Sequence, residues 1–157
     1  METVTRVRLL ILLGLNLLLF LCVGCASGPV YQDYASTIES PAPGRGRVYI
    51  YRPSALPLAD VVGVVVHVND AVLEHWPRPR TFVVLDQPEG EVRIRIYSGE
   101  VSFPLQSGET RYVKIRASHG LGATSLYLEL VGPEQGRTEI EGLRLVGEET
   151  EPAAGSP

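Results

Sequence analysis

Cysteine is scarce in this chain, and both cysteines lie near its N-terminal end. The 157 residues contain only Cys22 and Cys25, three positions apart. A disulfide framework needs cysteines distributed through the folded part of a chain, and a thiolate metal site needs several that converge. Because no thiol follows Cys25, packing rather than cross-linking must stabilise the fold of the remaining residues.

An excess of positive charge is also missing. The chain has 14 Lys and Arg against 18 Asp and Glu, which gives a formal net charge of -4. Nucleic-acid binding depends on clustered basic residues that neutralise phosphates. We therefore expect no nucleic-acid partner, and no attachment to an anionic surface by charge alone.

No apolar run is long enough to favour a membrane-spanning helix. The longest, Leu9 to Val23, has about 15 residues, whereas a spanning helix needs about 20. Arg6 and Arg8 precede the run and small residues follow it, which is the layout of a secretory signal. We predict that residues 1–24 are a removable signal peptide; an uncleaved transmembrane anchor is the alternative.

The junction after this run, LCVGCAS at residues 21–27, resembles the lipobox of bacterial lipoproteins, in which a small residue precedes the lipidated cysteine. Gly24 and Cys25 match that pattern, although Cys22 stands where leucine is usual. The resemblance implies cleavage between Gly24 and Cys25 and a lipid on the Cys25 thiol. Each buried methylene contributes about 0.8 kcal/mol, so two or three acyl chains would form a durable membrane anchor.

The residue that follows Cys25 bears on location. By resemblance to the sorting rule of diderm bacteria, a residue other than Asp at this position favours the outer membrane, and here it is Ala26. We therefore expect a lipid-anchored protein of the cell envelope, on the periplasmic side of the outer membrane if the host is diderm.

The segment from residue 25 to residue 46 has no apolar period, and its three prolines oppose regular structure. We predict that it is a flexible tether, whose roughly 20 residues would have a root-mean-square reach of about 25 Å. Docking of Tyr31 and Tyr34 on the folded domain is the alternative. At the other end, residues 148–157 are predicted to be a disordered tail.

Between residues 47 and 147, apolar residues alternate with polar ones and β-branched residues are frequent. In VRIRIY, for example, Val92, Ile94 and Ile96 should face inward while the arginines between them face water. The pattern predicts an all-β domain, a small antiparallel β-sandwich. The predicted strands are 47–52, 60–69, 72–76, 81–86, 92–97, 101–105, 111–116 and 125–131.

Turn and helix signals in this region are short. Asn69-Asp70 suits a tight hairpin turn between two strands. Little else departs from the strand pattern, and only a short turn near Pro133 to Gly136 is expected to be helical. Leu143 and Leu145 are expected to close the core.

Five segments of this domain recur in the same order in one known family. They are GRVYIYRPS at 46–54, HVND at 67–70, PEG at 88–90, SGETRYVKI at 107–115 and LELVGPEQGRTEI at 128–140. Over most of residues 47–140 the chain is similar to the DUF2846 family of small bacterial envelope domains, many of them lipoproteins. The resemblance implies a β-sandwich like those of PEGA and transthyretin-like domains, with no known activity and no catalytic residue. Asp70, where the family tends to have glycine, and WPRPR at 76–80 depart from the pattern.

No set of residues has the spacing of a catalytic or metal site. The candidate zinc ligands are His67, Glu74, His75 and His119, but their spacing does not favour convergence. Ser118 precedes His119 in a segment that lacks the G-x-S-x-G elbow of hydrolases. We expect no catalytic residue, no metal and no cofactor.

Four neighbouring residues are predicted to contact a ligand or partner: His75, Trp76, Arg78 and Arg80. Trp76 is the only tryptophan; it would plug the edge of the sandwich or, alternatively, serve as a binding platform. The preferred hypothesis is a non-catalytic module that binds another envelope component, either a protein or a cell-wall polymer. The alternative is a small-ligand carrier or an enzyme that uses the loops near His75, Trp76 and His119.

Overall fold

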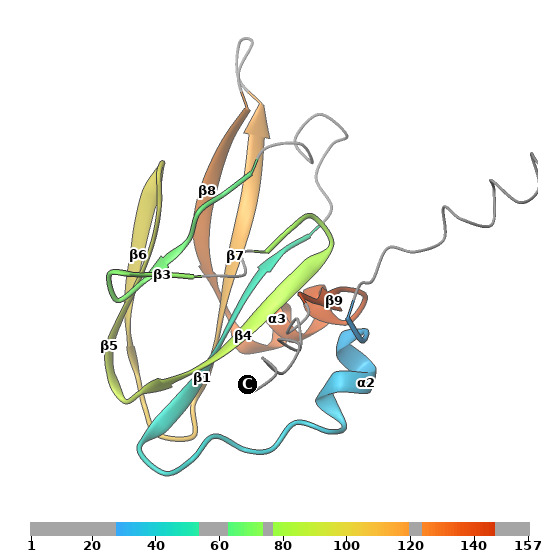
Figure 1. Ribbon diagram of the computed structural model, residues 1–157, viewed down its shortest axis with the longest axis vertical. Coiled ribbons are helices and arrows are strands. Elements are labelled where there is room, and N and C mark those ends of the chain that lie inside the picture. Colours follow the sequence, from blue (N-terminus) through green and yellow to red (C-terminus); the bar gives the residue numbers. More distant parts are fainter. Residues whose placement is uncertain (1–27, 54–62, 74–76, 120–123, 147–157) are drawn as a thin grey trace, which may run out of the picture.

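The computed structural model describes residues 28–53, 63–73, 77–119 and 124–146 (Figure 1). The predicted signal peptide, the Gly24–Cys25 junction, the C-terminal tail and the predicted contact residues His75 and Trp76 lie outside these residues. Among the residues described, no helix combines the length and apolar content needed to cross a membrane.

Two β-sheets form the centre of the molecule (Figure 1). The larger has the strand order β8-β7-β1-β4-β9, and the smaller has the order β3-β2-β5-β6. The predicted all-β sandwich is therefore confirmed. The larger sheet is mixed, because β1 pairs in parallel with β7 and β4 pairs in parallel with β9. The strands are β1 (Arg45–Arg52), β2 (His67–Val68), β3 (Ala71–Val72), β4 (Thr81–Pro88), β5 (Gly90–Ile96), β6 (Gly99–Leu105), β7 (Thr110–His119), β8 (Thr124–Val131) and β9 (Arg144–Leu145).

The core lies between the two sheets and is built by alternation along the strands. In β5, Val92, Ile94 and Ile96 are buried while the arginines between them are exposed, as the sequence predicted. β-branched residues dominate this core because their stiff side chains pack well on a pleated surface. Its buried members are Val48, Ile50, Val64, Val66, Val68, Val83, Val92, Ile94, Ile96, Phe103, Leu105, Val113, Ile115 and Leu126.

The predicted hairpin turn at Asn69-Asp70 is confirmed. Both residues have positive φ, 49° and 69°, which is the backbone of a type I′ turn. The Asn69 side-chain oxygen also accepts a hydrogen bond from the Arg93 backbone, at 2.9 Å. The flanking strands are shorter than predicted: of the described residues, only His67–Val68 and Ala71–Val72 are strand.

The outer face of the larger sheet is also buried, so the molecule has three layers. Aromatic residues of β1, β4 and β7 form a second core there, and the rings of Tyr49 and Tyr112 stack with centroids 5.2 Å apart. Two helices, α2 (Tyr31–Ala35) and α3 (Pro133–Ile140), lie beside β9 on this side of the sheet (Figure 1). As predicted, Leu143 is buried and Leu145 packs against the same core.

The prediction of only a short turn near Pro133 to Gly136 is wrong, because α3 continues to Ile140. Pro133 suits the first position of a helix, where its missing N–H is not needed. The helix is polar along most of its length, which hid its period in the sequence. Ile140 and Gly136 are its buried residues, and they face the second core.

The prediction of a flexible tether is wrong for the part that the structure describes. Val30 pairs with Arg144 as an antiparallel bridge, and the Tyr31 N–H donates to the Leu143 carbonyl at 2.9 Å. The rings of Tyr31 and Tyr34 lie 5.6 and 5.8 Å from the ring of Phe82. The alternative, docking of these tyrosines on the domain, is correct, because burial of their rings outweighs the polar composition around them.

Candidate functional site

The outer face of the smaller sheet carries exposed apolar residues. Val65, Val72 and Tyr97 are large hydrophobic side chains that remain accessible there. The alternation that turns Val64 and Val66 inward turns Val65 outward. Contiguous exposed apolar surface on a small domain is a common feature of binding sites.

A cavity of about 370 Å³ opens on this face. Its position follows from the pairing of β2 with β5, which sets His67 opposite Arg95. The Nδ1 atom of His67 is buried and has no hydrogen-bond partner among the described residues. The Arg95 guanidinium lies 3.6 Å from the Asp70 carboxylate at the rim. The lining residues are Gly63, Val65, His67, Arg95, Ile96 and Tyr97.

The lining of this cavity has the chemistry of a binding site. Mostly apolar walls with one imidazole and one guanidinium suit an apolar group that carries a hydrogen-bonding or acidic end. The Tyr97 hydroxyl is a further polar group of the lining. Of the four candidate zinc ligands, His67 lines the cavity, His119 ends β7, and Glu74 and His75 lie outside the described residues. Within the described part of the chain, no three His, Cys, Asp or Glu side chains converge as a metal site.

Arg78 and Arg80, the two predicted contact residues that the structure describes, lie at an end of the larger sheet. They form the turn before β4, where the Thr81 hydroxyl donates to the Arg78 carbonyl at 2.8 Å. Arg80 has a φ of 64° and donates its N–H to the Arg52 carbonyl at 2.8 Å. Both side chains are exposed, and Arg144 of β9 pairs with Thr81 beside them. The structure therefore groups them with Arg144, which the sequence did not indicate.

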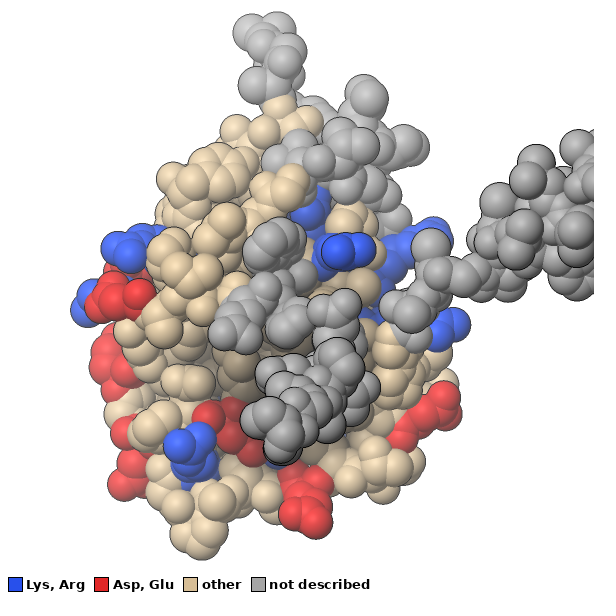
Figure 2. All heavy atoms as spheres, viewed as in Figure 1, with Lys and Arg blue, Asp and Glu red and all other residues tan. Residues whose placement is uncertain are grey.

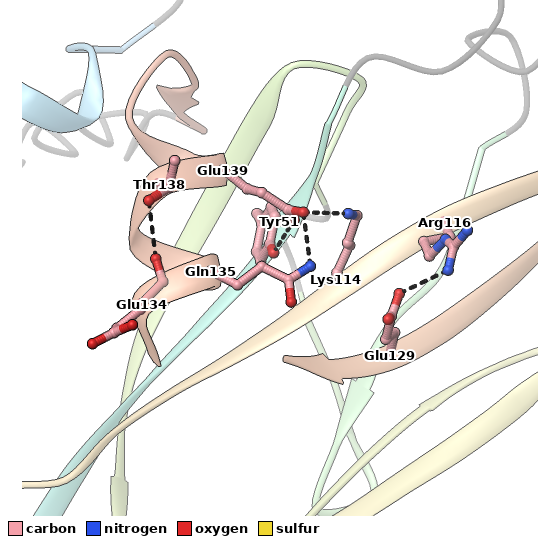
Figure 3. A network of polar contacts seen from close by, with 8 residues as sticks. All are labelled: Tyr51, Lys114, Arg116, Glu129, Glu134, Gln135, Thr138 and Glu139. Carbon is pink, nitrogen blue, oxygen red and sulfur yellow. Dashed lines mark hydrogen bonds and ion pairs between the residues drawn. The ribbon is translucent and has the colours of Figure 1, made fainter. Parts of the chain in front are cut away.

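A polar network joins α3 to the larger sheet (Figure 3). The Glu139 carboxylate accepts hydrogen bonds from the Lys114 amine at 2.7 Å, the Tyr51 hydroxyl at 2.6 Å and the Gln135 amide at 2.9 Å. Burial acts to raise the pKa of Glu139, but these three hydrogen bonds outweigh it and lower the pKa. Burial, and then the hydrogen bond to Glu139, raise the pKa of Tyr51.

This network holds α3 against the sheet. Both carboxylate oxygens of Glu139 accept hydrogen bonds, and the three donors come from β1, β7 and α3 itself. A second pair on β7 and β8, Arg116 with Glu129 at 3.1 Å, is exposed (Figure 3). Deeper in the layer, burial raises the pKa of Tyr112 to about 12, so its hydroxyl stays neutral at physiological pH.

A partly buried ion pair fixes the start of β1 against β4. The Arg47 guanidinium binds the Asp86 carboxylate in a bidentate manner, at 2.7 and 2.9 Å, and the two residues are register partners. The hydrogen bond to Asp86 raises the pKa of Arg47. Such a pair specifies strand register, because slippage would leave a buried charge unpaired.

No family model, curated protein or solved structure matches this chain. The fold and the surface features therefore define its class by themselves: a two-sheet β-sandwich with a helical layer on one face and an apolar cavity on the opposite face.

Proposed function

We propose that this chain is a lipid-anchored protein of the bacterial cell envelope, whose β-sandwich binds another envelope component without catalysing a reaction. The observation that carries the proposal is the junction at Gly24 and Cys25, where small residues after a short apolar run precede a cysteine. The order of motifs that resembles DUF2846 supports the same assignment. The all-β fold is compatible with it.

The proposed contact surface is the cavity on the outer face of the smaller sheet. A partner side chain or a polymer substituent with an apolar body would pack on Val65 and Tyr97, and an acidic or hydrogen-bonding end would pair with the Arg95 guanidinium.

Metabolic labelling with palmitate tests the anchor. Label is expected in the wild-type protein and in Cys22→Ser, and none is expected in Cys25→Ser. The Cys22 variant is the matched control, because it removes the other thiol of the chain, which lies within the predicted signal peptide three residues before Cys25. Label that persists in Cys25→Ser would contradict the proposal.

Fractionation of a diderm host tests the location. The wild-type protein, with Ala26 after the cysteine, is expected in the outer membrane. Ala26→Asp should shift it toward the inner membrane while palmitate labelling continues. Equal distribution of both proteins would show that this residue does not direct sorting.

Photo-crosslinking tests the contact surface. Tyr97 and Tyr127 are both exposed tyrosines, at 66% and 49% of their surface, but only Tyr97 lines the cavity. A photoreactive phenylalanine derivative at position 97 is expected to attach to an envelope protein or cell-wall polymer, whereas the same group at position 127 is not. Attachment of a small extractable molecule at position 97 would indicate the carrier function instead, which the cavity also favours. Equal products at both positions would contradict both functions.

A further inference from the structure

The described part of the chain begins beside β9, close to the proposed anchor. The Gly28 carbonyl accepts a hydrogen bond from the Arg144 side chain at 3.3 Å, and the Leu145 N–H donates to the Pro29 carbonyl at 3.0 Å. Residues 25–27 separate the proposed lipidation site from Gly28. Even fully extended, three residues span only about 10 Å, so a lipid on Cys25 would hold this end of the domain next to the headgroups.

Three arginines surround the same end of the domain. Arg144 lies beside Gly28, and its N–H donates to the Arg80 carbonyl at 3.1 Å. Arg78 and Arg80 lie in the turn before β4, and all three side chains are exposed. We call Arg78, Arg80 and Arg144 the basic rim.

The basic rim contrasts with the charge of the rest of the molecule. Considering the residues that the structure describes, none of its three arginines forms an ion pair, a state that they share with Arg45 and Arg137, whereas Arg47, Arg93, Arg95, Arg111 and Arg116 are ion-paired. Figure 2 shows Lys and Arg side chains gathered at the upper right, near the end of β1 and the start of β4, with acidic side chains elsewhere on this face. The whole chain carries a formal charge of -4, so an anionic surface repels most of it.

We propose that the basic rim rests on anionic phospholipid headgroups of the membrane that holds Cys25, and so fixes the orientation of the domain. The inference rests on the proposed lipid anchor. Charge alone does not bring an acidic protein to this surface, but the anchor supplies the high local concentration at which three unpaired arginines become effective. In this orientation β9 faces the membrane, and β5 and β6 of the smaller sheet, on the opposite side in Figure 1, face away from it with the cavity accessible to a partner.

Two glycines allow this orientation to be measured in the full lipidated chain. A side chain added at Gly142, two residues before Arg144, or at Gly99, at the start of β6, meets nothing within 4 Å. With Cys25 lipidated and Cys22 removed with the signal peptide, a cysteine placed at either position is the only free thiol. Each variant is labelled with a fluorophore and reconstituted into phosphatidylcholine vesicles, with or without phosphatidylglycerol, that contain a headgroup nitroxide quencher.

With phosphatidylglycerol present, quenching at position 142 is expected to exceed quenching at position 99 by about twofold or more. High salt, or vesicles without phosphatidylglycerol, should reduce the difference. Because the anchor alone already holds this end near the headgroups, replacing all three rim arginines with glutamine should lower the difference to the value found without phosphatidylglycerol. The matched control, Arg45→Gln, Arg93→Gln and Arg116→Gln together, removes the same charge from other exposed positions and should leave the difference intact.

The outcomes separate the orientation from the anchor itself. If Gly142→Cys and Gly99→Cys are quenched equally, or if the rim variant behaves like the control, the orientation is wrong although the protein still floats with the vesicles. If Cys25→Ser floats as well as wild type, the lipid anchor is wrong. Circular dichroism of each variant confirms that the fold is retained, so loss of quenching does not reflect unfolding.

Discussion

Adjacent residues of β5 face opposite environments, and this makes their substitutions differ sharply. Ile94 is 0% exposed, whereas the Arg95 side chain is 47% exposed. Ile94→Asp removes a buried apolar group and places a carboxylate without a partner in the core, which should cost several kcal/mol, on the order of 4. Arg95→Asp replaces an exposed ion pair with Asp70 by two exposed carboxylates and should lower the free energy of unfolding by only about 1 kcal/mol.

Urea denaturation of both variants checks this prediction. Ile94→Asp is expected to be largely unfolded without denaturant, and Arg95→Asp to unfold with a midpoint close to that of wild type. Greater damage from Arg95→Asp would mean that the strand faces are inverted.

Single residues of the candidate site show how far the sequence alone could reach. The sequence suggests His67 only as a metal ligand, because a histidine among alternating valines gives no sign of a cavity. It suggests Arg78 and Arg80 as contact residues, which stays a prediction, but Arg144 comes much later in the chain. Only the parallel pairing of β4 with β9 brings Arg144 beside them.

At the scale of elements, α3 depends on a glycine that touches the sheet. A side-chain carbon added at Gly136 would lie 2.3 Å from the Tyr112 ring, whereas one added at Gly142 meets nothing within 4 Å. Alanine favours a helix interior over glycine by about 1 kcal/mol, but this contact forces α3 or Tyr112 to move. Gly136→Ala should therefore lower the free energy of unfolding by about 1–3 kcal/mol, and Gly142→Ala should leave it nearly unchanged.

Thermal melts of these two variants give the comparison directly. A Gly136→Ala protein as stable as wild type would show that α3 packs loosely on Tyr112.

The hydrogen bonds that fasten α3 through Glu139 should make stability depend on pH. The pKa of Glu139 is lowered from its ordinary value of 4.5 in the folded state. A carboxylate with a lowered pKa contributes stability that is present above the unfolded-state value and is lost as pH falls through the folded-state value. Acidification below about pH 4.5 should therefore weaken wild type more steeply than Glu139→Gln.

The free energy of unfolding, measured in urea at a series of pH values from neutral to about 3, tests this difference. Other carboxylates titrate in both proteins, so the gap between the two curves isolates Glu139. Parallel curves would contradict the proposed role of its three hydrogen bonds.

For strands with one solvent-exposed face, the sequence predicts which residues are buried. For strands with two buried faces, it does not show that the second face is covered. β5 alternates because water lies on one side, and the residues that face inward were predicted correctly. β1 is buried on both faces, and nothing in its own sequence indicates that other elements cover Tyr49 and Tyr51. The elements that cover them, α2 and α3, are mostly polar. Their packing on the sheet depends on contacts with residues far away in the sequence.

For the whole molecule, the N-terminal segment acts as part of the fold. Deleting residues 28–44 exposes the ring of Phe82 and one side of Tyr49, which Tyr31 contacts with centroids 5.6 and 5.7 Å away. A chain that begins at Arg45 should keep both sheets but lose about 2 kcal/mol or more of stability relative to one that begins at Gly28.

Denaturation curves of the two truncated proteins, supported by far-ultraviolet circular dichroism, decide this point. The double variant Tyr31→Ala and Tyr34→Ala in the longer chain should reproduce most of the loss. Equal stability of the two truncations would restore the original prediction of a free tether.

The pairing of Pro29 with Leu145 has a mechanical consequence. A force that pulls the domain away from its proposed anchor acts at Gly28. It therefore breaks the hydrogen bonds beside β9 one after another rather than all together. Those bonds and the tyrosine contacts of α2 break before the long strand pairs of the sheets carry tension. Release of residues 28–44 would lengthen the connection by up to about 55 Å while both sheets stay paired. If Cys25 is lipidated as proposed, tension on the domain would lengthen its connection to the membrane, and relaxation would let α2 dock again.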